Sequence, residues 1–201
     1  ITGQTYGHLD GQTNSGGGDA FVSKFDSDGS KQWTQLLGTF QQDYGNSIST
    51  ADDGSVYITG QTYGHLDGQT NSGGGDAFVS KFDSDGSKQW TQLLGTQSHE
   101  AGNSISTRED GSVYITGITY GGPDGHTYRG NGDVFVSKFD SDGSKQWTQL
   151  LGTSLSSGEL GYSISTAADG SIYITGYTKG DLDGQTNSGE EDAFISKYSS
   201  D

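Results

Sequence analysis

The chain has 201 residues, a length that one domain can hold, but only 28% of them are hydrophobic and glycine supplies 35. This composition is too poor in apolar residues for a helical core and suits a sheet protein with many turns. The formal net charge of −16 disfavours nucleic acid and anionic membranes as partners, and the lack of cysteine excludes disulfides and thiolate metal sites.

The sequence repeats itself with a period of 57 residues. Residues 1–39 recur letter for letter at 58–96, an edited third copy begins at Ile115, and a shorter fourth copy begins at Ile174. A repeat of this length indicates an array of one supersecondary unit. We therefore expect a single repeat array over 1–201, with units at about 1–57, 58–114, 115–173 and 174–201.

The second unit shows the strands that each repeat is expected to contain. In chain order they are 44–51, 56–62, 76–83 and 88–95, and the link 96–101 leads into the next unit. Asp-Gly turns join the first strand to the second and the third to the fourth, whereas a Gly- and Asn-rich loop joins the second to the third. Four antiparallel strands per repeat are typical of one β-propeller blade. We predict an all-β propeller of 14 strands, about three and a half blades, with the tryptophan of each fourth strand packed between blades (Trp33, Trp90 and Trp147).

These residues resemble the bacterial SBBP repeat, a repeat of seven-bladed β-propellers. The resemblance rests on the DG-x-VYITG hairpin, the LDG-x-TN loop, the DAFVSK strand and the KQWTQLLGT strand, and it covers essentially the whole chain. It implies a propeller architecture and a secreted or cell-surface bacterial protein, and it implies no known reaction. Because a fold does not determine a function, the function has to be argued from sites.

The LDGQTN loop that follows the second strand is a candidate calcium site. Its carboxylates, amide oxygens and backbone carbonyls can supply the roughly six to eight oxygen ligands that calcium takes. In the alternative interpretation, Asp and Asn cap the turn through its backbone amides and no metal is bound. Calcium is the one cofactor that the sequence suggests, and the candidate ligands are Asp10, Asn14, Asp19, Asp67, Asn71, Asp76, Asp124, Asp133, Asp183, Asn187 and Asp192.

A second set of candidates combines loop aromatics with the links between units. The links vary, reading FQQDY at 40–44, QSHEA at 97–101 and SLSSGEL at 154–160, whereas the strand framework is nearly constant. Because strands alternate in direction, we expect these links and the loops after the second strands to lie on one face of the propeller. The candidate ligand-binding residues on that face are Tyr6, Tyr63, Tyr120, Phe40, Tyr44, His99 and Glu100.

The sequence contains neither a GxSxG nucleophile elbow nor an HExxH zinc motif, so we expect no enzyme activity. An enzyme stays a remote alternative, for which the third copy, with His126 and Arg129, is the candidate. We expect an extracellular or cell-surface scaffold that presents variable loops on rigid blades and binds a protein or a surface glycan. The alternative is a lectin with repeated, calcium-assisted sites. No membrane insertion is expected, and a homo-oligomer and a longer propeller array both stay open.

Overall fold

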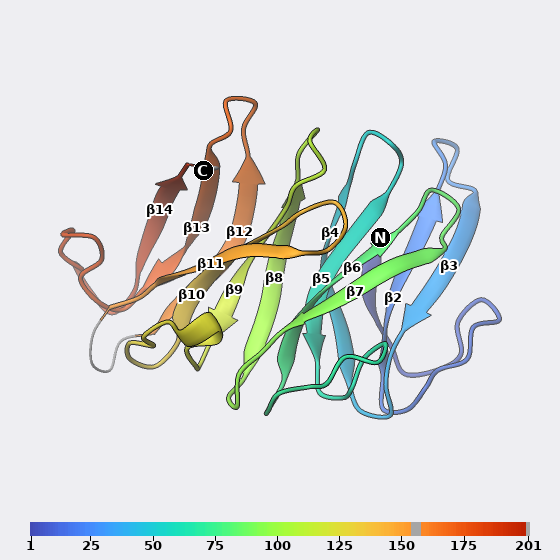
Figure 1. Ribbon diagram of the computed structural model, residues 1–201, viewed down its shortest axis with the longest axis horizontal. Coiled ribbons are helices and arrows are strands. Elements are labelled where there is room, and N and C mark those ends of the chain that lie inside the picture. Colours follow the sequence, from blue (N-terminus) through green and yellow to red (C-terminus); the bar gives the residue numbers. More distant parts are fainter. Residues whose placement is uncertain (154–157, 200–201) are drawn as a thin grey trace.

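The computed structural model describes residues 1–153 and 158–199, which form 14 β-strands and one short 3₁₀ turn, η1 (Pro123–Gly125). The strands make four antiparallel sheets, and Figure 1 shows these following one another in chain order from the blue sheet to the red one. The first sheet contains β1 (Thr2–Thr5), β2 (Asp19–Phe25) and β3 (Lys31–Leu37). The second contains β4 (Asp43–Thr50), β5 (Val56–Thr62), β6 (Asp76–Phe82) and β7 (Lys88–Leu94). The third contains β8 (Glu100–Thr107), β9 (Val113–Thr119), β10 (Asp133–Phe139) and β11 (Lys145–Leu151), and the fourth contains β12 (Glu159–Thr166), β13 (Ile172–Thr178) and β14 (Asp192–Tyr198).

The prediction of an all-β propeller fold is confirmed, and the strand order in each sheet is the order along the chain. The predicted strand 56–62 coincides with β5. The first strand, predicted at 44–51, begins one residue earlier in the structure, because Asp43 pairs with Thr62. The predicted third strand ends one residue too late. Asp83 belongs to the turn instead, where its carboxylate accepts hydrogen bonds from the Asp85 and Ser87 amides. Within the described residues, no helix is long and apolar enough to cross a membrane.

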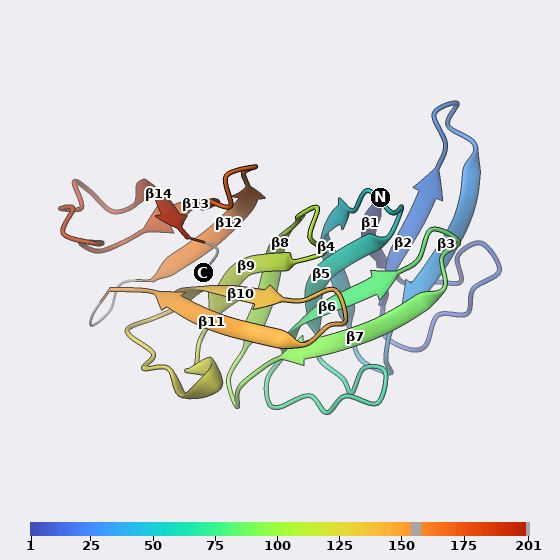
Figure 2. The ribbon, with the colours of Figure 1, turned by 45° about the horizontal axis from the view of Figure 1, so that its top comes forward.

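The first strands β4, β8 and β12 lie next to one another (Figure 2). They belong to separate sheets and are joined by polar contacts. The side-chain amide of Asn46 donates to the Gly102 carbonyl at 2.9 Å, and the side-chain amide of Asn103 donates in the same way to the Gly161 carbonyl. A side chain at Gly102 would place its Cβ 2.2 Å from the hydroxyl of Thr59, so glycine is required for this close approach. This arrangement explains why the first strands are rich in small polar residues.

The apolar core lies between neighbouring sheets. One cluster packs Ala20, Val22 and Leu37 of the first sheet against Ile58 and Phe78 of the second, and two further clusters repeat this pattern along the array. The prediction that the tryptophans pack between blades is confirmed for all three copies, because Trp33, Trp90 and Trp147 each pack against one of these clusters. The indole N–H groups of Trp33 and Trp90 also donate at 3.0 and 3.1 Å to carbonyls in the turn of the next sheet.

A buried carboxylate begins each first strand. Glu100 is fully buried, and it accepts hydrogen bonds from the Thr96 amide at 2.6 Å, the Thr96 hydroxyl at 2.7 Å and the Thr119 hydroxyl at 2.8 Å. Thr96 follows the last strand of the preceding sheet, whereas Thr119 ends the second strand of the sheet that Glu100 begins. The carboxylate therefore ties two sheets together. Equivalent contacts are made by Asp43 with Thr39 and Thr62, and by Glu159 with Thr153 and Thr178.

A second buried carboxylate stands beside the first at each of these junctions. The backbones of Gly75 and His99 pair as a parallel bridge, which makes the following residues, Asp76 and Glu100, neighbours. One Asp76 oxygen accepts the Ser72 amide at 2.9 Å. The other is buried and has no hydrogen-bond partner among the described residues, and the same holds for the matching atoms of Asp19 and Asp133. Burial raises the pKa of Asp76, and the nearby charge of Glu100 raises it further. Burial also raises the pKa of Asp133, to about 6.

We predict that Glu100→Ala lowers the free energy of unfolding by about 2–4 kcal/mol, because three donors lose their buried acceptor. The measurement is the urea unfolding midpoint. Two variants serve as controls for Glu100→Ala. Glu100→Asp keeps a carboxylate, as Asp43 does at the preceding junction, and Glu109→Ala truncates an exposed carboxylate. Equal midpoints for Glu100→Ala and Glu109→Ala would contradict the role assigned to Glu100.

We predict that Asp133→Asn stabilises the chain in a pH-dependent way. The pKa of Asp133 rises from 3.8 to about 6 on folding, so its contribution to stability is full below pH 4 and is lost as the pH rises through 6. Asparagine carries no charge to desolvate, so the variant should match the native chain near pH 4. At pH 8 it should exceed it by up to about 3 kcal/mol. Thermal melts across this range test the prediction, with Asp142→Asn as the exposed control, and a constant difference at all pH values would refute it.

Candidate functional site

The links between sheets and the loops after the second strands lie on the same face, as the alternation of strand direction predicts. The Gly74 amide of the loop after β5 donates to the Ser98 carbonyl of the link before β8 at 2.7 Å. The same link also contacts the start of the loop after β9, because the Tyr120 amide donates to the His99 carbonyl at 3.0 Å. Links and loops therefore interlock into one continuous surface, here called the loop face.

Four aromatic side chains form a row across the loop face: Tyr44, Tyr63, His99 and Tyr120. Successive ring centroids are 6.4, 5.7 and 6.0 Å apart, and the rings meet at angles of 60–77°. The Tyr63 hydroxyl and His99 Nε2 share a hydrogen bond of 3.0 Å. The row thus crosses from the second sheet to the third.

Each member of the aromatic row is positioned by backbone pairing. Tyr44 lies in β4, Tyr63 and Tyr120 directly follow the second strands β5 and β9, and His99 precedes β8. Gly75 gives the middle of the row its space, because a Cβ there would lie 3.2 Å from the Tyr63 ring and 3.3 Å from the His99 ring. The buried Glu100, next to His99 in the chain, anchors the link from below.

The chemistry of the aromatic row is that of binding by contact and hydrogen bonding. Tyr120 is 41% exposed, and Tyr44, Tyr63 and His99 are half-buried. In the described part of the chain, His99 Nδ1 is buried and has no hydrogen-bond partner. Rings held at fixed angles beside phenolic hydroxyls suit recognition of a partner that offers both apolar and polar groups.

The structure brings together four of the seven residues predicted to bind a ligand. Tyr6 and Phe40 are 69% and 88% exposed, and the contacts within residues 1–153 and 158–199 do not join them to the row. At the junction between the first and second sheets, Gln42 takes the place that His99 has at the junction between the second and third sheets. Glu100 is fully buried beneath the loop face, because its oxygens accept hydrogen bonds from Thr96 and Thr119. The link residues 154–157 lie outside the described residues.

Two glutamines belong to this surface and were missed by the sequence analysis. The Gln61 amide donates to the Tyr63 hydroxyl at 3.3 Å, and the Tyr44 hydroxyl donates to the Gln42 side-chain oxygen. Each glutamine lies two residues from the tyrosine that it contacts. That spacing along an extended strand places both side chains on one face, and it is the signal that identifies them.

In the LDGQTN loop, the first aspartate has protein partners in three copies. Asp67 forms an ion pair with Lys88 and accepts the Thr91 hydroxyl, while its backbone adopts a positive φ of 50° in a tight Asp-Gly turn. Asp10 pairs in the same way with Lys31, and Asp124 with Lys145. Hydrogen bonds from Lys31 and Thr34 lower the pKa of Asp10. These carboxylates attach the fourth strand of each sheet to the loop.

The other candidate calcium ligands also serve the loop itself. The side-chain amide of Asn71 donates to the Thr62 carbonyl at 3.1 Å and its oxygen accepts the Gly73 amide, and Asn14 and Asn187 make the same contacts. Asp192 accepts the Ser188 amide at 2.7 Å. Within residues 1–153 and 158–199, no group of three or more His, Cys, Asp or Glu side chains gathers where a metal ion could bind. The calcium site therefore stays a prediction from the sequence.

The third copy differs from the others at the same loop. Tyr128 replaces the loop asparagine, and His126, Arg129 and Asp133 line one polar pocket of about 280 Å³. The Arg129 amide donates to Asp133 at 2.9 Å. This is the asymmetric cluster that the sequence singled out as the place where an enzyme site could be built.

Comparison with known proteins agrees with the sheet pattern. Residues 32–67, which run from β3 through β4 and β5 into the following loop, match the SBBP β-propeller repeat, and this match confirms the resemblance. The chain is also 28% identical over 160 residues to the "Regulatory protein FlaEY" of Caulobacter vibrioides. The alignment covers 72% of this chain and 17% of that protein, so the chain spans a small part of its relative's length.

Proposed function

We propose that the chain is a non-enzymatic interaction module that acts outside the cell and binds a partner protein through the aromatic row on its loop face. The observation that carries the proposal is the row itself, in which Tyr44, Tyr63, His99 and Tyr120 form a continuous set of ring contacts across two sheets. No covalent chemistry is part of this function. The rigid sheets act as the support that holds the row in place.

The asymmetry of the row favours one protein partner over repeated glycan sites. Tyr44 and His99 lie in the variable segments 40–44 and 97–101, and Gln42 of the first segment stands where His99 stands in the second. The repeated element that a lectin would use, the LDGQTN loop, has its Asp67 and Asn71 oxygens occupied by contacts within the protein. A surface that differs from blade to blade suits one extended ligand.

The residue types and their order suit a high-affinity contact. Tyrosine is enriched among the residues that dominate binding energy at protein interfaces. The hydrogen bond between Tyr63 and His99 and the contacts among the rings fix the side chains before a partner arrives, which reduces the entropy lost on binding. The net charge of −16 favours a neutral or basic partner. The relative's name, a regulatory protein, fits a function in binding.

We predict that Tyr63→Ala weakens the binding of protein ligands by roughly 30-fold, the loss expected when a central aromatic anchor of about 2 kcal/mol is removed. The purified chain is screened against displayed protein domains and, separately, against a glycan array, and the affinities of selected ligands are then measured for each variant. Tyr63→Phe keeps the ring but loses the hydrogen bond to His99, so its loss should be smaller.

Tyr173→Ala is the matched control, because Tyr173 is a half-buried tyrosine near the opposite end of its sheet, where Lys197 lies 5.6 Å from its ring centroid. Thermal melts establish that each variant is folded. Protein ligands whose affinity is the same for Tyr63→Ala and the native chain would contradict the proposal. Glycan binding with several equivalent sites per chain would favour the lectin instead.

A further inference from the structure

The third sheet has a polar pocket between the loop after β9 and the strand β11. The pocket has a volume of about 280 Å³, and its walls include His126, Arg129, Asp133 and Gln149. The first two residues belong to the loop, Asp133 begins β10, and Gln149 lies in β11. Ligand pockets range from about 300 to 1,000 Å³, so a pocket of this size suits a small molecule.

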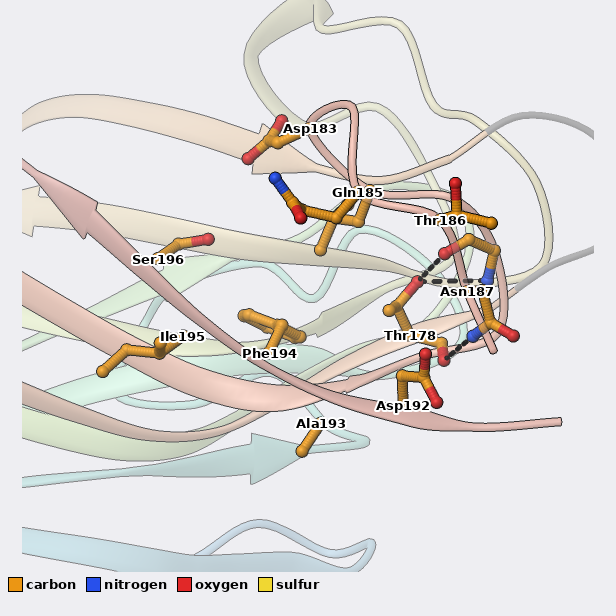
Figure 3. Close-up of a pocket in the computed structure, with 12 residues that line it drawn as sticks. Thr178, Asp183, Gln185, Thr186, Asn187, Asp192, Ala193, Phe194, Ile195 and Ser196 are labelled. Atoms are coloured by element: carbon orange, nitrogen blue, oxygen red, sulfur yellow. Dashed lines mark hydrogen bonds between the residues drawn. The ribbon is translucent and has the colours of Figure 1, made fainter. Parts of the chain in front are cut away.

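The loop beside this pocket is held differently from the loops of the other copies. In those copies an asparagine ties the loop to the second strand. Figure 3 shows this contact in the fourth copy, where the Asn187 side-chain amide donates to the Thr178 carbonyl at 3.1 Å. In the third copy Tyr128 takes the place of the asparagine, and Gly130 and Gly132 adopt positive φ angles of 101° and 120°. The backbone of this loop therefore follows its own path past β11.

The strand on the other side of the pocket shows the same difference. Gln149 is exposed, whereas its counterparts Gln35 and Gln92 in β3 and β7 are half-buried. The three strands have the same sequence, so the difference lies in the segments around them. The third copy thus uncovers a side-chain amide that can both donate and accept hydrogen bonds.

Asp133 forms the buried end of the pocket and is 1% exposed. One of its oxygens accepts the Arg129 amide at 2.9 Å, and the other, Oδ1, has no hydrogen-bond partner among the described residues. A Cβ on Gly152, which also lines the pocket, would lie 2.4 Å from Oδ1, so this oxygen faces the pocket wall. Burial, together with the nearby charge of Glu159, raises the pKa of Asp133 to about 6. Above that pH the pocket therefore ends in a carboxylate that lacks a donor.

Two donor side chains that occur together in the third copy line the same pocket. These are His126 and Arg129, whereas every other copy has glutamine and serine at the two positions. Arg129 is exposed, and within residues 1–153 and 158–199 neither an ion pair nor a hydrogen bond engages its guanidinium. Asp19 and Asp76 share the unpartnered oxygen but have no arginine beside it. The third copy therefore combines an unpaired anion with an unpaired cation.

We propose that this pocket binds a small polar α-amino acid as its zwitterion. The ammonium group donates to Asp133 Oδ1, and the carboxylate pairs with the Arg129 guanidinium and accepts a hydrogen bond from the His126 ring. A simple anion would leave Asp133 without a donor, and a simple cation would be repelled by Arg129. A zwitterion has no net charge, so the charge of −16 on the chain does not repel it. This inference is independent of the aromatic row.

The test is isothermal titration calorimetry of the full chain above pH 6 with glycine, serine, threonine, asparagine and glutamine. We expect saturable binding of at least one of these amino acids at a single site per chain. The amide of that amino acid lacks the carboxylate, and its N-acetyl derivative lacks the ammonium group. Each derivative should bind about ten-fold more weakly or worse, because a charged hydrogen-bonding group is lost.

Three variants of the chain locate the site, and thermal melts establish that each is folded. Arg129→Ser restores the residue of the other copies and should weaken binding about ten-fold or more, as should Asp133→Asn. Arg108→Ser is the matched control, because it removes the one other arginine, which lies in the turn after β8 and outside the pocket. Its affinity should equal that of the native chain.

Three results would overturn the proposal. The first is that none of the five amino acids binds. The second is that the amide or the N-acetyl derivative binds as tightly as the free amino acid. The third is that Arg129→Ser and Arg108→Ser have the same affinity, which would place the bound molecule elsewhere on the chain.

Discussion

The arrangement of the sheets depends on a carboxylate that is buried at the start of each first strand. At the junction before the third sheet, Glu100 receives the Thr96 amide and hydroxyl from the end of the preceding sheet and the Thr119 hydroxyl from its own. A buried charge is stable only when its hydrogen-bonding capacity is met, so the three donors and the carboxylate fix one another. The apolar clusters between sheets add cohesion to the contact that these carboxylates make.

The loop face inherits its order from these junctions. His99 immediately precedes Glu100, and the His99 carbonyl accepts the Tyr120 amide. The anchoring of Glu100 therefore orients the rings of both His99 and Tyr120. Gly75, which pairs with His99, precedes Asp76, the second buried carboxylate of the junction. The same few residues thus hold two sheets together below the surface and carry the aromatic row above it.

Much of the fold could be predicted from the sequence, because the signals are local and recur in every copy. The DDGS and SDGS turns mark hairpins, and the β-branched run at 56–62 coincides with β5. The site was harder to predict, because its partners are distant in sequence. Asp67 resembles a metal ligand in a Gly-rich loop, and only the folded sheet reveals that Lys88, 21 residues further on, reaches it. Likewise, the burial of Glu100 depends on Thr119, whose role no local pattern indicates.

The junctions also bear on how such arrays change in length. At Asp43 and Glu100 the junction joins residues at the same offsets: one threonine lies four residues before the carboxylate, and another lies nineteen residues after it. Duplication or deletion of a stretch of the gene that encodes 57 residues recreates an intact junction at the new boundary in the protein. Insertions of other lengths are tolerated where the link can absorb them, as before Glu159, where the threonine lies six residues away. Recombination that adds or removes a whole coding repeat therefore preserves the residue pairs on which each junction depends.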